Sequence, residues 1–171
     1  MKFAPSHRFA AILPLPVCLL LAACAGYAPT HVQTGQAEAD VVREMGKPTH
    51  RYSLPDGGIR LEYARGPYGK HTYMIDLDRD GRVQRWTQVL TEENFSHVRA
   101  GESRDQLLLD LGRPSETRSG DWQGGRVWSY RYDAWTCQWF QVSLNDAGVV
   151  TSTSYGIDPH CDLNGNDRGE K

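Results

Sequence analysis

The chain contains one internal repeat, and this feature limits its fold more than any other. The segment His31-Val32-x-x-Gly35 recurs as His97-Val98-x-x-Gly101, 66 residues later. The same offset is kept up to Pro114, and after one inserted residue an offset of 67 continues to Val150. Repetition at a fixed spacing indicates copies of one supersecondary unit. We therefore expect two tandem modules.

Each copy opens with a pattern typical of a helix. In the second copy, Ser103 and Gln106 have the spacing of a capping box, and Gly112 followed by Pro114 ends the pattern. The first copy has Ala37 at the cap position, which predicts a weaker helix start. Between the copies, residues 91–94 (Thr-Glu-Glu-Asn) predict a further short helix before the second module.

Three strands are expected after each helix. They are residues 60–64, 72–77 and 82–89 in the first copy and residues 127–132, 137–144 and 149–155 in the second. Alternating apolar side chains place one face of each sheet under the helix. The expected fold class is α+β, with tandem modules at residues 31–90 and 91–161. Each module is predicted to be a short helical pair packed on a small antiparallel sheet of about three strands.

The first residues predict an export signal. Lys2 and Arg8 precede an apolar run from Phe9 to Leu21, and this run is shorter than the roughly 20 residues that a membrane-spanning helix needs. The run ends in Leu21-Ala22-Ala23-Cys24, which resembles the lipobox of bacterial lipoproteins.

The lipobox resemblance implies that residues 1–23 are removed as a signal peptide and that Cys24 carries the lipid. Residues 24–30 would then be a tether to the membrane. Ala25 follows the cysteine, and the sorting rule of enteric bacteria then implies the periplasmic side of the outer membrane. An ordinary secretory signal, which would leave Cys24 as a plain thiol, is the alternative.

The charge balance excludes nucleic acid as a partner, and the cysteine content indicates a disulfide. The chain after residue 23 carries 17 basic and 21 acidic side chains, so it lacks the basic surface that nucleic acid requires. In an oxidising compartment, Cys137 and Cys161 remain to form one disulfide, with two unpaired thiols as the alternative. Residues 162–171 have almost no apolar side chains, and we expect them to be a disordered tail.

The sequence indicates a binding protein rather than an enzyme. It has no recognised catalytic motif, and we expect no metal ion and no cofactor. The Asp76-x-Asp78-x-Asp80-Gly81 segment is interpreted as a hairpin turn rather than a calcium loop. Strand alternation turns Trp135 and Trp139 away from the helix, which makes them a candidate partner surface. Packing of that face against the first repeat or the C-terminal segment is the alternative.

The repeated motifs resemble the BamE (SmpA/OmlA) family of lipoproteins. The motifs are Gly35, Met45-Gly46-Lys47-Pro48 and Asp78-Arg79-Asp80-Gly81, with counterparts Gly101, Leu111-Gly112-Arg113-Pro114 and Asn145-Asp146-Ala147-Gly148. The resemblance implies a small α+β lipoprotein that assists the outer-membrane β-barrel assembly machine. BamE itself has one module, and the tandem arrangement is similar to the β-lactamase inhibitor protein, a secreted binder.

Together these features predict a non-enzymatic, protein-binding lipoprotein of the outer membrane. Its partners would be the membrane, through the lipid anchor, and an envelope protein such as the β-barrel assembly machine. Its role would be outer-membrane protein assembly or envelope maintenance. An inhibitor or binder of a periplasmic enzyme is the alternative, and an enzyme without a recognisable motif is a further one.

Overall fold

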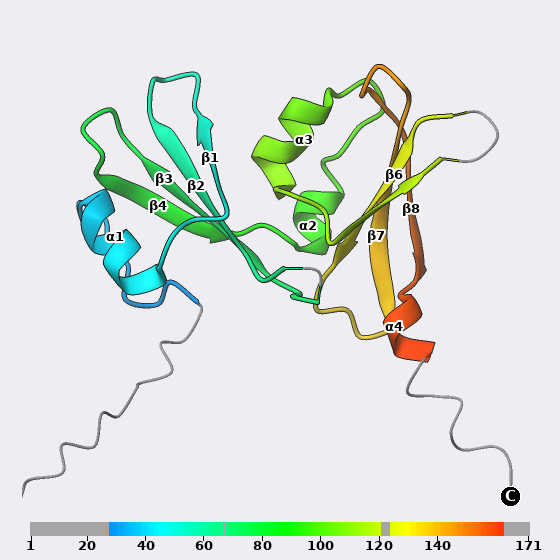
Figure 1. The fold of residues 1–171 in the computed structure, drawn as a ribbon, viewed down its shortest axis with the longest axis horizontal. Helices are drawn as coiled ribbons and strands as arrows, with labels where there is room; N and C mark the ends of the chain where they lie inside the picture. The colour runs from blue at the N-terminus through cyan, green and yellow to red at the C-terminus, as the bar shows by residue number, and fades with distance from the viewer. Residues whose placement is uncertain (1–27, 67, 121–123, 163–171) are drawn as a thin grey trace, which may run out of the picture.

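The computed structural model describes residues 28–66, 68–120 and 124–162, with side chains up to His160. Two four-stranded antiparallel sheets dominate this part of the chain (Figure 1). Sheet 1 has the order β1 (His50–Ser53), β2 (Ile59–Ala64), β3 (Thr72–Leu77), β4 (Val83–Gln88). Sheet 2 has the order β5 (Glu116–Ser119), β6 (Arg126–Arg131), β7 (Gln138–Leu144), β8 (Val150–Ile157). The helices are α1 (Glu38–Met45), α2 (Glu92–Phe95), α3 (Arg104–Leu111) and α4 (Pro159–Asp162).

The predicted fold class is wrong, because the protein is mostly β and each sheet has four strands rather than three. The additional strands are β1 and β5, whose sequences are His-Arg-Tyr-Ser and Glu-Thr-Arg-Ser. Both lie at a sheet edge and have no apolar alternation, so the sequence pattern did not predict them. The helical pairs are also incorrect, since the described part of the first module has α1 alone before its sheet.

The remaining strands lie within a few residues of their predicted positions. The β3–β4 turn confirms the hairpin interpretation, because the Asp78 carboxylate accepts hydrogen bonds from the backbone amides of Asp80 (2.9 Å) and Arg82 (2.8 Å). Gly81 has φ of 71° in this turn, a conformation that favours glycine. Asn145 repeats the arrangement in the second module by accepting from the Val149 amide at 2.9 Å.

The two helix starts differ as the sequence predicts. The Ser103 hydroxyl accepts a hydrogen bond from the Gln106 amide at 3.1 Å, whereas Ala37 offers no side-chain cap. The capping box is only half formed, since the Gln106 side chain donates to Asp110 at 2.9 Å instead of reaching back to Ser103. Both helix starts are tied to a hairpin by isolated bridges, Ala37 with Arg82 and Ser103 with Val149.

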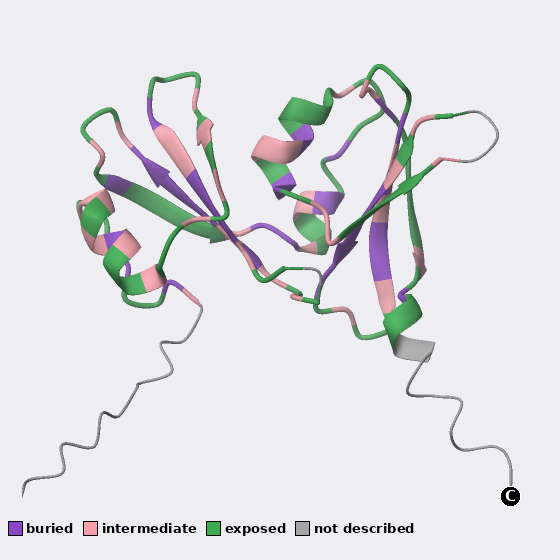
Figure 2. Cartoon of the chain, in the orientation of Figure 1, coloured by how far each residue is buried: buried purple, intermediate pink, exposed green. Residues whose placement is uncertain are grey.

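Each sheet has a buried face beneath its own helix (Figure 2). The core under α1 comprises Val32, Val41, Leu61, Tyr63, Ile75, Leu77 and Val83. The core under α2 and α3 includes Phe95, Leu107, Leu111, Trp128, Tyr130, Phe140, Val142 and Leu144. The alternation predicted for β3 and β7 is therefore correct.

The other face of sheet 1 is covered by the second module, because α3 lies between the two sheets (Figure 1). Met74 of β3 packs in the core of the second module. Arg60 of β2 donates a hydrogen bond to the Leu109 carbonyl at 2.6 Å and so satisfies a carbonyl near the end of α3. Sheet 1 is therefore buried on both faces along part of its width.

Glu62 of β2 is the central polar group of this junction and is fully buried. Its carboxylate accepts hydrogen bonds from the Tyr52 hydroxyl (2.5 Å) and from the backbone amide of Arg113 (3.0 Å). Gly112 allows this approach, since a Cβ there would lie 2.9 Å from the Met74 methyl and 3.0 Å from a Glu62 oxygen. Buried polar groups are stable only when hydrogen-bonded, so the second module must sit where it satisfies Glu62.

We predict that Glu62→Ala lowers the free energy of unfolding by about 2–4 kcal/mol, because it leaves the Tyr52 hydroxyl and the Arg113 amide unpaired in a buried site. Glu62→Gln, which keeps one acceptor oxygen, should cost less. Urea denaturation of both variants measures the effect, with Glu116→Ala on an exposed strand as the control. A Glu62→Ala protein as stable as the wild type would contradict the role assigned to this carboxylate.

Candidate binding surfaces

Trp135 lies in the loop between β6 and β7 and is fully exposed (108 %). Two contacts with the first module hold the loop, because Asp133 pairs with His71 at 2.8 Å and with Lys70 at 3.6 Å. Cys137, which follows the loop, is disulfide-bonded. The side chain of Cys161 lies outside the described residues, so its pairing with Cys137 stays a prediction. Trp135 is thus an exposed aromatic on a loop that contacts the first module.

Trp139, the other half of the predicted partner surface, is buried and only 4 % exposed. It lies on the outer face of sheet 2 as predicted, but the Arg131 guanidinium covers its ring with 5.1 Å to the ring centre. Asp158 holds Arg131 in place through an ion pair at 2.6 Å. The structure therefore separates the two tryptophans and leaves only Trp135 available to a partner.

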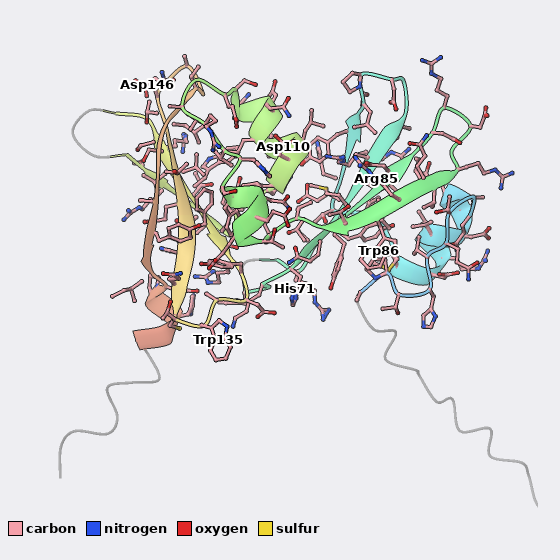
Figure 3. All side chains as sticks on the ribbon, turned by 180° about the vertical axis from the view of Figure 1, so that it is seen from behind. His71, Arg85, Trp86, Asp110, Trp135 and Asp146 are labelled. Atoms are coloured by element: carbon pink, nitrogen blue, oxygen red, sulfur yellow. The ribbon has the colours of Figure 1, made fainter. Side chains whose placement is uncertain are left out.

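Further aromatic side chains continue the exposed surface along one edge of the molecule. Tyr68 is 71 % exposed and Trp86 is 39 % exposed. Trp86 meets Tyr73 edge-on with ring centres 6.0 Å apart, and His71 stacks on Tyr73 at 6.1 Å. Trp86, His71 and Trp135 follow the same edge in Figure 3. We call Tyr68, His71, Trp86 and Trp135 the anchor edge.

The described chain begins beside this edge. Val32 packs in the same core as Tyr73, and the Thr34 hydroxyl donates to the Gln84 carbonyl at 3.3 Å. The first described residues therefore run along β4 close to Trp86 (Figure 3). Cys24, the predicted lipidation site, lies outside the described residues, only four positions before Ala28.

A cleft of about 330 Å³ lies between the two modules and contains a charged cluster that the sequence analysis missed. Asp76 of β3 pairs with Arg60 at 2.6 Å and with Arg85 at 2.9 Å. Burial opposes ionisation of Asp76, but hydrogen bonds and charges from the two arginines outweigh it and lower the pKa of its carboxyl. Arg60 on β2 and Arg85 on β4 lie directly opposite Asp76 in the strand register, so the register of the hairpins could have indicated this pairing.

A larger hollow, of about 630 Å³, lies at the opposite end of the second module from Trp135. Figure 3 shows Asp146 of this hollow at the top and Trp135 at the bottom. We call it the module-2 hollow. Its walls come from the start of α3, from β5 and β6, and from the β7–β8 hairpin, and include Arg104, Thr117, Arg126, Trp128, Leu144 and Asp146.

Within residues 28–66, 68–120 and 124–162, no group of three or more His, Cys, Asp or Glu side chains is placed to hold a metal ion. Among the helices of that same part of the chain, none is long and apolar enough to cross a membrane.

No protein-family model matches the sequence, and no curated protein matches it. The fold is similar to a Streptococcus mutans protein provisionally described as a beta-lactamase inhibitor protein, with a TM-score of 0.30 and 12 % identity over 75 % of this chain and 87 % of that chain. It is also similar to a cysteine-rich secretory protein of Staphylococcus aureus, with a TM-score of 0.28 and 12 % identity over 74 % of this chain and 44 % of that one.

A third similar structure is an extracellular protein of Bacillus anthracis that contains a SCP domain, with a TM-score of 0.29 and 10 % identity. The likeness covers 76 % of this chain and 45 % of that one, so this chain spans less than half of the two longer proteins. These identities and TM-scores are too low to transfer an activity or a partner.

The two buried aspartates predict an acid-sensitive fold. Burial opposes ionisation of Asp158, but hydrogen bonds from Arg131 and the His160 amide lower its pKa, as the arginines do for Asp76. A carboxyl with a lowered folded-state pKa contributes stability that is present above its unfolded pKa of about 3.9 and is lost as pH falls through the folded value. We therefore expect the free energy of unfolding to fall below about pH 4.

The Asp76→Asn and Asp158→Asn variants should be less stable than the wild type at pH 7 and should lose less stability on acidification. Urea denaturation between about pH 7 and pH 2 measures both effects. An equally steep loss in the double variant would show that other groups cause the acid sensitivity.

Proposed function

We propose that this chain is a lipoprotein of the bacterial outer membrane, anchored on the periplasmic side through Cys24, which binds other envelope proteins without catalysing a reaction. The observation that carries the proposal is the position of the anchor edge. Trp86 lies close to where the described chain begins, a few residues after the predicted lipidation site, and His71 and Trp135 follow the same edge from there onto the second module (Figure 3).

The tether is short, so the position of the anchor edge relative to the lipid matters. Ala28 follows Cys24 by four positions, and an extended chain over four residue steps spans about 14 Å. A lipid on Cys24 would therefore hold this end of the protein close to the membrane surface. Tryptophan and tyrosine favour the boundary between water and lipid, because their rings are apolar and their N–H or O–H groups are polar. Trp86, Trp135 and Tyr68 are suited to that boundary.

Binding rather than catalysis is supported by how the buried charged groups are used. Glu62 joins the modules, Asp76 is held by two arginines, and Asp158 is held by Arg131. These contacts use the carboxylates as structural groups and turn two repeats into one scaffold. Among binding tasks, the BamE resemblance favours assistance to outer-membrane protein assembly, and we propose that task first.

The proposal predicts that Cys24→Ser abolishes palmitate labelling and releases the chain from outer-membrane fractions. The same strain should contain fewer folded outer-membrane β-barrels than the wild type. Labelling equal to that of wild type would overturn the lipoprotein assignment. Loss of labelling with unchanged β-barrel content would contradict the assembly task.

The anchor edge is tested on the lipidated protein in vesicles that contain brominated lipids, which quench nearby tryptophans. We expect Trp86→Phe and Trp135→Phe each to reduce the quenched fluorescence. The control is Trp128→Phe, because Trp128 lies in the wall of the module-2 hollow at the other end of the molecule. Unchanged quenching in the double variant of Trp86 and Trp135 would show that this edge does not lie on the membrane.

A further inference from the structure

The two modules have different side chains around the start of their main helix, α1 in the first and α3 in the second. In the first module, Arg51 of β1 reaches across to α1 and forms a two-pronged ion pair with Glu38, with one contact at 3.2 Å and a second, shorter one. Arg79 of the β3–β4 turn donates to the Asp56 carbonyl at 2.5 Å and crosses between the two hairpins. Arg51 thus links the edge strand to the helix start, and Arg79 links one hairpin to the other.

The second module lacks both arginines at the matching positions. The offset of 66 places Thr117 at the position of Arg51 and Arg104 at the position of Glu38, while the offset of 67 places Asp146 at the position of Arg79. Thr117 is too short to reach α3 as Arg51 reaches α1, and Asp146 contacts the nearby Gly125 amide through a short carboxylate instead of a long side chain. The module-2 hollow of about 630 Å³ is lined by Thr117, Asp146 and Arg104.

The exchange also reverses the charge on the helix. Glu38 in the first module is an acid paired with a base from the strand, whereas Arg104 is a base opposite the uncharged Thr117. Arg104 is paired only loosely with its neighbour Asp105, at 3.5 Å, and the two side chains are 60 % and 82 % exposed. A guanidinium binds a carboxylate through two parallel hydrogen bonds. A carboxylate that enters the hollow could pair with Arg104. This pair would correspond to the Arg51–Glu38 pair of the first module, with the positive charge on the helix instead of the negative one.

Other groups in the walls favour the same type of ligand. Arg126 adds a second guanidinium, and Trp128 and Leu144 supply apolar surface. The Asp146 carboxylate already accepts a hydrogen bond from the Gly125 amide at 2.8 Å, which ties it to the wall. The walls also carry the carboxylates of Asp146 and of Asp105, which is loosely paired with Arg104. Beside them, the hollow presents two guanidiniums and an apolar wall, which suit an acidic side chain followed by an apolar one.

We propose that the module-2 hollow binds an acidic segment of a partner protein, whose carboxylate pairs with Arg104. The proposal deepens the binding function proposed above by stating the chemistry of the partner. The hollow lies at the end of the second module away from the anchor edge (Figure 3). On an anchored protein it would face away from the membrane, where a periplasmic partner can reach it.

The test uses the lipidated full chain in nanodiscs and the blocked peptide acetyl-Ala-Glu-Glu-Leu-amide. Binding is followed by NMR through the amides of Gly125 and Gly148, with the matching Gln-Gln peptide as the comparison. We expect the acidic peptide to shift these amides and the Gln-Gln peptide to bind at least about tenfold more weakly, since it lacks the ionised acceptor. Equal binding of the two peptides would overturn the proposal.

The repeat itself supplies the decisive variant. The double variant Arg104→Glu with Thr117→Arg rebuilds the ion pair of the first module, and it should fill the hollow without loss of stability. We expect it to lose acidic-peptide binding, and we expect Arg104→Gln, which leaves the hollow open, to weaken binding about tenfold. Arg43→Gln on α1 is the matched control, since Arg43 is an exposed helix arginine far from the hollow, and it should change nothing.

Wild-type affinity in both Arg104 variants, or peptide-induced shifts confined to the anchor edge, would overturn the proposal. Its failure is separable from that of the proposed function. A chain that takes up palmitate through Cys24 but does not bind the peptide contradicts only the acidic-ligand site. A chain that binds the peptide but is not lipidated contradicts only the membrane anchor.

Discussion

The arrangement of this molecule depends on one buried carboxylate, that of Glu62. It lies on the face of sheet 1 away from α1 and is satisfied by Tyr52 and by the Arg113 amide just after α3. Burying an acceptor without its donors costs free energy of folding. The end of α3 must therefore lie against sheet 1 where the Arg113 amide reaches Glu62. The glycine at position 112 and the contact from Arg60 to the Leu109 carbonyl fit the same approach. The two repeats consequently form one body with defined ends.

The two ends of the molecule carry different surfaces because the two repeats have different residues there. At one end, His71 and Asp133 join the modules beside exposed aromatic side chains, close to the start of the described chain. At the other end, the ion pair of Arg51 and Glu38 has no counterpart, and a hollow takes its place. Glu62 itself corresponds to Ser129 in the second copy, 67 residues later. Residues shared by the copies maintain the module fold, whereas the exchanged residues create the surfaces that we assign to binding.

The sequence predicted what local periodicity determines and missed what depends on distant partners. The repeat, the cap at Ser103 and the buried faces of β3 and β7 follow from spacing and alternation. The edge strands β1 and β5 were missed because four polar residues carry no alternation. Alternation left two possibilities for Trp139, a partner surface or packing against another segment, and Arg131, held by Asp158, buries it. Glu62 is buried because the second module covers the face of sheet 1 away from α1. Local alternation in β2 does not indicate this coverage.

If the contacts of Glu62 hold the two repeats together, the modules open as one cooperative unit, and native-state hydrogen exchange in increasing denaturant measures this most directly. We expect the slowest amides of β2 and β3 and those of β6 and β7 to converge on the same opening free energy. Two separate opening energies, with the first sheet exchanging while the second stays protected, would contradict it. That result would show two independent domains for which the contacts of Glu62 are incidental.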